Sequence, residues 1–130
     1  MDKEKIINYL KDNDLSDVEI LSQQKDLAAV RFYYDFDDTE LKAAEAYAKD
    51  QAGDEKDEAW FQDYYIPYLT EVAVDNVGDI IEDLMAEMKV KAQFISYEME
   101  EDNDYSEFIA IFYNGEEDID IEDVLVKLGI

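Results

Sequence analysis

Carboxylate side chains recur at every fourth position along one stretch of this sequence. They are Glu71, Asp75, Asp79, Asp83 and Glu87, and no lysine or arginine follows Glu71 before Lys89. Residues four apart are neighbours on a helix, where each pair of like charges costs about 0.2–0.5 kcal/mol. Each step of four residues advances about 6 Å along the helix axis. The phosphates along a nucleic-acid strand are likewise a few ångströms apart. The spacing predicts either a surface for a basic partner or the solvated face of a helix in an acidic protein.

A second group of carboxylates lies in the segment YEMEEDNDYSEF, residues 97–108. Its members are Glu98, Glu100, Glu101, Asp102, Asp104 and Glu107. Three interpretations are open: a site for a divalent cation, a contact surface for arginine and lysine, or a solvated hairpin turn. A calcium loop that began at Asp102 would need glycine where Glu107 stands and a carboxylate where Tyr113 stands. We therefore predict no metal ion and no other cofactor at this segment.

Side chains that commonly carry out catalysis are scarce. The chain contains no histidine and no cysteine, so the commonest general base and the thiol nucleophile are both missing. It has only four glycines, and they form no glycine-rich phosphate loop. We predict that the protein is not an enzyme. A hydrolase that uses a metal ion or a pair of carboxylates stays open as the lowest-ranked alternative.

The overall charge restricts the class of partner. The chain has 11 basic and 36 acidic residues, for a net charge of −25. Nucleic acids and anionic membranes are bound through basic surfaces, so direct binding to either is not expected. A basic protein, such as a nuclease or another nucleic-acid-binding protein, has the complementary charge. The N-terminal residues lack the apolar run of a signal peptide, and no stretch has the length of a membrane span, which predicts a cytoplasmic protein.

Hydrophobic patterns predict the elements that would position these carboxylates. Residues 2–11 have the spacing of a short amphipathic helix. Residues 18–22 and 27–36 have the composition of strands, and in the second strand Val30, Phe32 and Tyr34 lie on one apolar face. Asp38 is predicted to cap a helix over residues 39–51.

The second half of the sequence predicts three more helices and two more strands. One helix begins near Asp54 or Asp57 and carries the aromatic segment WFQDYYIPYL, which we interpret as core, with an interface as the alternative. Pro67 either kinks this helix or begins the next, over residues 67–89. Strands over 90–100 and 105–113 form a hairpin that is covered on both faces or lies centrally. Residues 114–118 are predicted to form a turn, and Asp120 to cap a last helix.

The order of these elements predicts the fold class. Strands come in hairpins, in the order α-ββ-ααα-ββ-α, and do not alternate with helices. We predict a single α+β domain over residues 1–130. Its mainly antiparallel sheet is built from two β-hairpins, and about five helices pack against it.

Three functional hypotheses follow, in this order. The first is a non-enzymatic acidic module that occupies a basic, nucleic-acid-binding surface of a partner protein. The carboxylates from Glu71 to Glu87, here called the acidic stripe, and the acids of residues 97–108 would take the place of phosphates. DNA-mimic inhibitors and toxin-neutralising immunity proteins work by this general logic, and the chain shares only charge and size with them. The second is a small housekeeping or regulatory domain whose acidity serves solubility. The third is the hydrolase named above.

Overall fold

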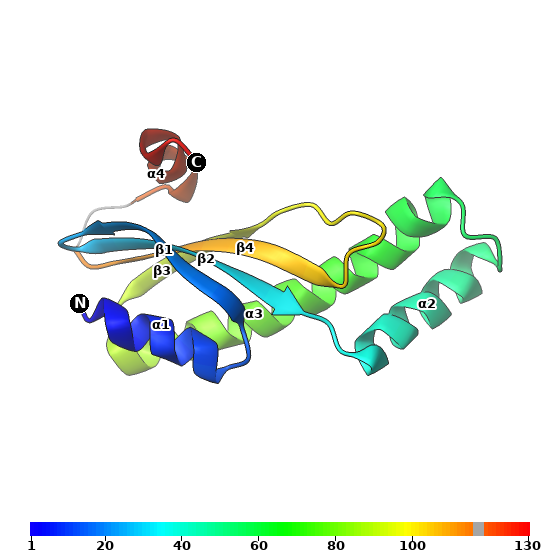
Figure 1. The fold of residues 1–130 in the computed structure, drawn as a ribbon, viewed down its shortest axis with the longest axis horizontal. Coiled ribbons are helices and arrows are strands. Elements are labelled where there is room, and N and C mark those ends of the chain that lie inside the picture. Colours follow the sequence, from blue (N-terminus) through cyan, green and yellow to red (C-terminus); the bar gives the residue numbers. More distant parts are fainter. Residues whose placement is uncertain (116–118) are drawn as a thin grey trace.

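The computed structural model describes residues 1–115 and 119–130, shown in Figure 1. The elements are α1 (Lys3–Asp12), β1 (Ser16–Gln24), β2 (Leu27–Asp35), α2 (Asp38–Ala52), the π-helical turn η1 (Trp60–Tyr65), α3 (Ile66–Met88), β3 (Lys91–Ser96), β4 (Tyr105–Tyr113) and α4 (Ile121–Leu128). The α+β class is confirmed. Part of the turn predicted at 114–118 lies outside the described residues.

The described strands form one antiparallel sheet in the order β1-β2-β4-β3. The two strands of each predicted hairpin pair with each other, β1 with β2 and β3 with β4. The two hairpins then join through β2 and β4, in register from Leu27 opposite Tyr113 to Asp35 opposite Tyr105. This central pairing places β4 inside the sheet and leaves β1 and β3 at its edges.

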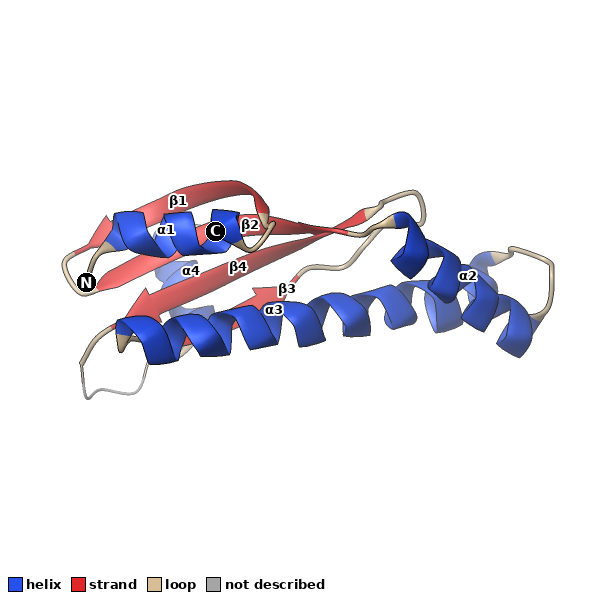
Figure 2. Cartoon of the chain, turned by 90° about the horizontal axis from the view of Figure 1, so that it is seen from below, coloured by secondary structure: helices blue, strands red, loops and turns tan. Residues whose placement is uncertain are grey.

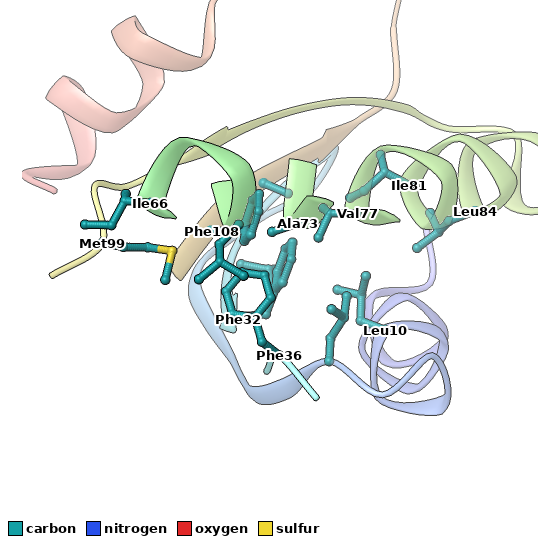
Figure 3. Packing of buried hydrophobic residues seen from close by; sticks show 14 of the residues in the cluster. Leu10, Phe32, Phe36, Ile66, Ala73, Val77, Ile81, Leu84, Met99 and Phe108 are labelled. Atoms are coloured by element: carbon teal, nitrogen blue, oxygen red, sulfur yellow. The ribbon is translucent and has the colours of Figure 1, made fainter. Parts of the chain in front are cut away.

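Helices cover the two faces of the sheet unequally. The helices α1 and α3 lie on one face, and the short α4 lies on the other (Figures 1 and 2). Alternation along β4 supplies both layers, because Phe108 and Phe112 enter the larger core while Ile109 and Ile111 pack beneath α4. Phe108 stacks on Phe32 of β2, with ring centroids 5.6 Å apart, in the core drawn in Figure 3. The expectation of a hairpin covered on both faces is met by β4 from Phe108 to Tyr113, but not by β3, which lies at the edge of the sheet.

Of the two places predicted for Pro67, the structure has the first turn of α3, but the prediction that separate helices precede and follow it is wrong. Residues 58–88 form one continuous helical rod, so the described chain has four α-helices rather than about five. The N–H of Ile66 donates to the carbonyl of Phe61, five residues back, within the π turn η1. Proline has no N–H and its ring crowds the carbonyl four residues earlier, and the wider π turn accommodates both effects.

The strand predicted over residues 90–100 is also too long. The strand β3 ends at Ser96, and residues 97–104 form a loop before β4. In this loop the backbone N–H of Glu100 donates to the Asn103 side chain (2.9 Å) and the N–H of Asn103 donates to the carbonyl of Glu100 (3.1 Å). Met99 turns into the core (Figure 3). A local turn and one apolar anchor thus take the chain away from the edge of the sheet.

Capping residues fix the helix ends close to their predicted places. The cap of α2 is Asp37 and not Asp38, and it forms a reciprocal capping box with Glu40. Asp120 caps α4 as predicted, accepting a hydrogen bond from the N–H of Glu122. Beyond the end of the sheet, α2 packs against η1 and the first turns of α3 (Figure 2). There Trp60 is only 2% exposed, which confirms the core interpretation for this part of the aromatic segment.

Candidate acidic interaction surface

The carboxylates of α3 form the first part of the candidate surface. All five predicted positions, Glu71, Asp75, Asp79, Asp83 and Glu87, are exposed. The opposite side of α3 is buried through Leu69, Ala73, Val77 and Leu84. This amphipathic division holds the helix on the sheet and directs its acidic side chains to solvent.

The acidic stripe winds around α3 and does not lie on one flat face. A step of four residues rotates by about 40° on an ideal helix, so the stripe turns by roughly 160° from Glu71 to Glu87. Its far end faces α1. Burial raises the pKa of the Tyr9 phenol in α1, and the charges of Asp83 and Glu87 raise it further. The stripe therefore begins on the outer surface and ends beside the neighbouring helix.

The loop of residues 97–104 forms the second part of the surface. It lies along the N-terminal half of α3, and a groove of about 640 Å³ separates the two segments. Glu71 of α3 and Glu98 and Glu100 of the loop line the same groove. Residues distant in the sequence thus bring one end of the stripe and one side of the loop together.

Apolar side chains line the groove together with these acids. They are Ile66, Pro67, Val74, Tyr97 and Met99. Of these residues, the sequence placed Tyr97 beside the acids and gave an interface as the alternative for the segment that contains Ile66 and Pro67, but it did not identify Val74 or Met99 as parts of a site. One signal was available: Met99 is a single apolar side chain between two glutamates, and such a residue in an acidic loop needs a buried contact. Figure 3 shows Met99 next to Ile66 at the end of the core.

The remaining loop acids lie toward the tip. Glu101, Asp102 and Asp104 are exposed. The carbonyl of Asp104 accepts a hydrogen bond of 3.0 Å from the N–H of Phe36, which ties the tip to the end of β2. Burial raises the pKa of the Tyr65 phenol, and the carboxylates of Glu45 and Asp104 add to the shift. The tip is therefore close to η1 and extends the negative potential toward α2.

Glu107 is not part of this surface. It lies on the face of the sheet that carries α4, because it alternates with Phe108, which belongs to the larger core. There its carboxylate pairs with the Arg31 guanidinium at 3.0 Å. The structure thus separates Glu107 from the other carboxylates of its own segment.

The carboxylates of the candidate surface form no ion pairs with the basic residues of the described chain. Within residues 1–115 and 119–130 the ion pairs are Arg31–Glu19, Arg31–Glu107, Lys49–Asp54 and Lys56–Glu45. No carboxylate of the stripe or of loop 97–104 takes part in them. Likewise, the described residues bring no three metal-ligating side chains together. None of the described helices is long and apolar enough to cross a membrane.

Comparisons with known proteins give no relative for this fold. Family models, curated proteins and solved structures were all searched, and none matches the chain. The class is therefore defined by the structure alone. It is an α+β domain with an uncompensated acidic surface over α3 and loop 97–104.

Proposed function

We propose that the protein is a non-enzymatic binding module that occupies a basic surface of a partner protein. The partner would be a nuclease or another nucleic-acid-binding protein. The observation that carries the proposal is the groove that Glu71, Glu98 and Glu100 line together with apolar side chains and without any basic residue. Carboxylates kept free of internal ion pairs are available to external cations.

The groove suits the two ends of an arginine or lysine side chain. Such side chains bury their aliphatic stems on apolar surface and keep the charged head in contact with polar groups. Val74 and Met99 offer contact to a stem, and Glu98 and Glu100 offer acceptors to the head. Burial of the stem gives the contact an apolar component that an exposed ion pair lacks.

The rest of the stripe would act mainly on the rate of encounter. Asp75, Asp79 and Asp83 are exposed, and exposed ion pairs contribute only about 0–1 kcal/mol each. Their summed field still attracts a basic surface and accelerates association, and salt weakens this effect. Binding by this mechanism should therefore be steeply salt-dependent.

The test is affinity purification from a nuclease-treated lysate with a salt gradient. The triple variant Asp75→Lys, Asp79→Lys, Asp83→Lys reverses the charge of the middle of the stripe, and Met99→Ser with Val74→Ser removes two apolar side chains from the groove. A control triple variant, Asp12→Lys, Asp50→Lys, Glu122→Lys, changes the net charge equally at exposed sites elsewhere. We expect one basic protein to elute at a defined salt step from wild type and control, and earlier or not at all from the other two.

The opposite result would favour the second hypothesis. If wild type and both triple variants retain the same mixture of abundant basic proteins, eluting together at low salt, the acidity serves solubility. Circular dichroism of each variant separates loss of binding from loss of folding.

A further inference from the structure

Half of one sheet face is left without a covering helix. The helix α4 packs over Ala29, Ile109 and Ile111, at the end of the sheet near the β1–β2 turn (Figure 1). Farther along the same face the side chains that alternate with the larger core are Arg31 and Tyr33 of β2 and Glu107 of β4. No element of the described chain covers these residues.

This uncovered half is an ordered patch with the composition of an interface. Arg31 is the only arginine in the chain. Its guanidinium is held between Glu107 of β4, at 3.0 Å, and Glu19 of β1, at 3.7 Å. Beside it Tyr33 and Tyr105 pack edge to face, with ring centroids 5.7 Å apart. Tyrosine and arginine are the residue types enriched in interface hot spots.

The patch also has a hollow and an excess of negative charge. A depression of about 510 Å³ is lined by Ser16, Asp17, Glu19, Tyr33, Asp35 and Tyr105. Tyr105 is 39% exposed although it is a large aromatic residue. The ion pairs of Arg31 use Glu19 and Glu107, and Asp17 and Asp35 remain exposed without an ion pair among the described residues.

We propose that this patch is a second interaction surface, which receives an arginine-bearing segment of a basic partner protein. The cationic side chain would lie against the rings of Tyr33 and Tyr105, with Asp17 and Asp35 as its counter-charges. Both cations are attracted to an aromatic ring, but only the planar guanidinium can stack flat on it and also form bidentate hydrogen bonds with a carboxylate. The sheet separates this patch from α3, so its function does not depend on the groove.

The test is a titration of the isotope-labelled protein, followed by NMR, with an oligoarginine peptide and an oligolysine peptide of equal length. We expect saturable shifts at the amides of Tyr33 and Tyr105, with tighter binding of oligoarginine. Tyr105→Ser should weaken this binding about two- to fivefold, the size of one exposed cation–π contact. The double variant Asp17→Asn, Asp35→Asn should weaken it as well, and Asp38→Asn, Asp50→Asn is the matched control.

Two results would overturn the proposal. One is that the amide shifts at Tyr33 and Tyr105 are absent, or are no larger than those at exposed acidic residues elsewhere on the protein. The other is that both peptides bind there equally and Tyr105→Ser changes nothing. The triple reversal of Asp75, Asp79 and Asp83 should leave the shifts in the patch intact, so failure of the α3 surface and failure of this patch are distinguishable.

Discussion

The hydroxyl of Tyr34 donates a hydrogen bond of 2.6 Å to the carboxylate of Glu40. The second oxygen of that carboxylate accepts from the backbone N–H of Asp37 at 3.0 Å, which closes the capping box of α2. Asn76 of α3 in turn donates to the Tyr34 hydroxyl at 2.7 Å. One phenol thus connects β2, α2 and α3, and it holds α2 against the rod formed by η1 and α3.

Tyr34→Phe should weaken this connection. The variant removes one hydrogen bond to a charged acceptor and one from an amide, and we expect a loss of about 1.5–3 kcal/mol in the free energy of unfolding. Urea denaturation measures the loss. Glu40→Gln leaves one acceptor oxygen for the two donors, so it should also lower stability, through the loss of one of these two hydrogen bonds. Equal stability of wild type and Tyr34→Phe would show that the network contributes nothing.

The same phenol should make stability depend on pH in alkaline solution. Burial and then the hydrogen bond to Glu40 raise the pKa of Tyr34 to about 12 from its ordinary value of 10.0. Below pH 10 the phenol is neutral in folded and unfolded chains, so its contribution is fully present. Between pH 10 and about 12 the unfolded chain loses the proton first, and the free energy of unfolding falls.

Comparison with Tyr34→Phe isolates this effect from the other tyrosines. The wild type should lose more stability than the variant over this pH range, as measured by urea denaturation at each pH. Ultraviolet titration should also show one fewer late-ionising phenol in the variant. Parallel pH profiles for the two proteins would contradict the raised pKa.

The core beneath α3 should be sensitive to truncation. Leu84 is fully buried among residues of α1, α3 and the sheet, and Leu84→Ala should cost about 2–5 kcal/mol through lost burial and the remaining cavity. Val126 of α4 is 78% exposed, so Val126→Ala should stay within about 0.5 kcal/mol of wild type. Urea midpoints of the two variants provide the measurement, and similar losses would contradict the placement of α3.

The acidic stripe should lower the stability of α3. Asp79→Asn removes the repulsion of Asp79 with Asp75 and Asp83, so we expect stability to rise by about 0.5 kcal/mol at low salt. The gain should shrink as sodium chloride screens the charges. Asp26→Asn, in the exposed turn between β1 and β2, changes the net charge equally and should have a smaller effect. Thermal melts of both variants over a salt series measure these effects. Equal changes in stability for Asp79→Asn and Asp26→Asn would contradict the prediction.

The end of α3 contains a backbone conformation that favours glycine. Lys89 has φ 55° and ψ 47°, in the left-handed region, and its N–H donates to the carbonyl of Met85. Lys89→Gly should therefore stabilise the protein by about 0.5–1 kcal/mol. Lys91→Gly, an exposed lysine two residues later in β3, should destabilise it by a similar amount. Urea denaturation compares the two, and a loss at both positions would contradict the assigned backbone.

The helical rod around Pro67 shows where prediction from local pattern fails. A proline inside an apolar helical pattern is compatible with a break, a kink or a first turn, and nothing in the local sequence distinguishes them. The continuous solution requires a π turn, and this turn buries Trp60 and Tyr65 beside α2. The local geometry thus combines an effect of Pro67, which the sequence contains, with the packing of η1 against α2, which the local pattern does not reveal.

For the candidate surface, too, some features followed from the local sequence pattern and others depended on the tertiary structure. That the acids of α3 are exposed followed from the helical spacing of Leu69, Ala73 and Val77, which must be buried on one side. That Glu71 meets Glu98 and Glu100 did not follow, because it depends on where loop 97–104 crosses α3. The separation of Glu107 from its neighbours follows from its place in β4, where it alternates with the buried Phe108, while residues 97–104 leave the sheet as a loop.

The sequence by itself determined the α+β class, the approximate ends of most elements, the two hairpins and the acidic side of α3. Each of these depends on a period of 2 or about 3.6 residues, or on a capping side chain, and these signals are local. Only the tertiary structure decided the strand order β1-β2-β4-β3, the single rod of residues 58–88 and the partners of Arg31. Those features arise from apolar faces and charges that meet across long stretches of chain, where many pairings satisfy the same local pattern and packing selects one.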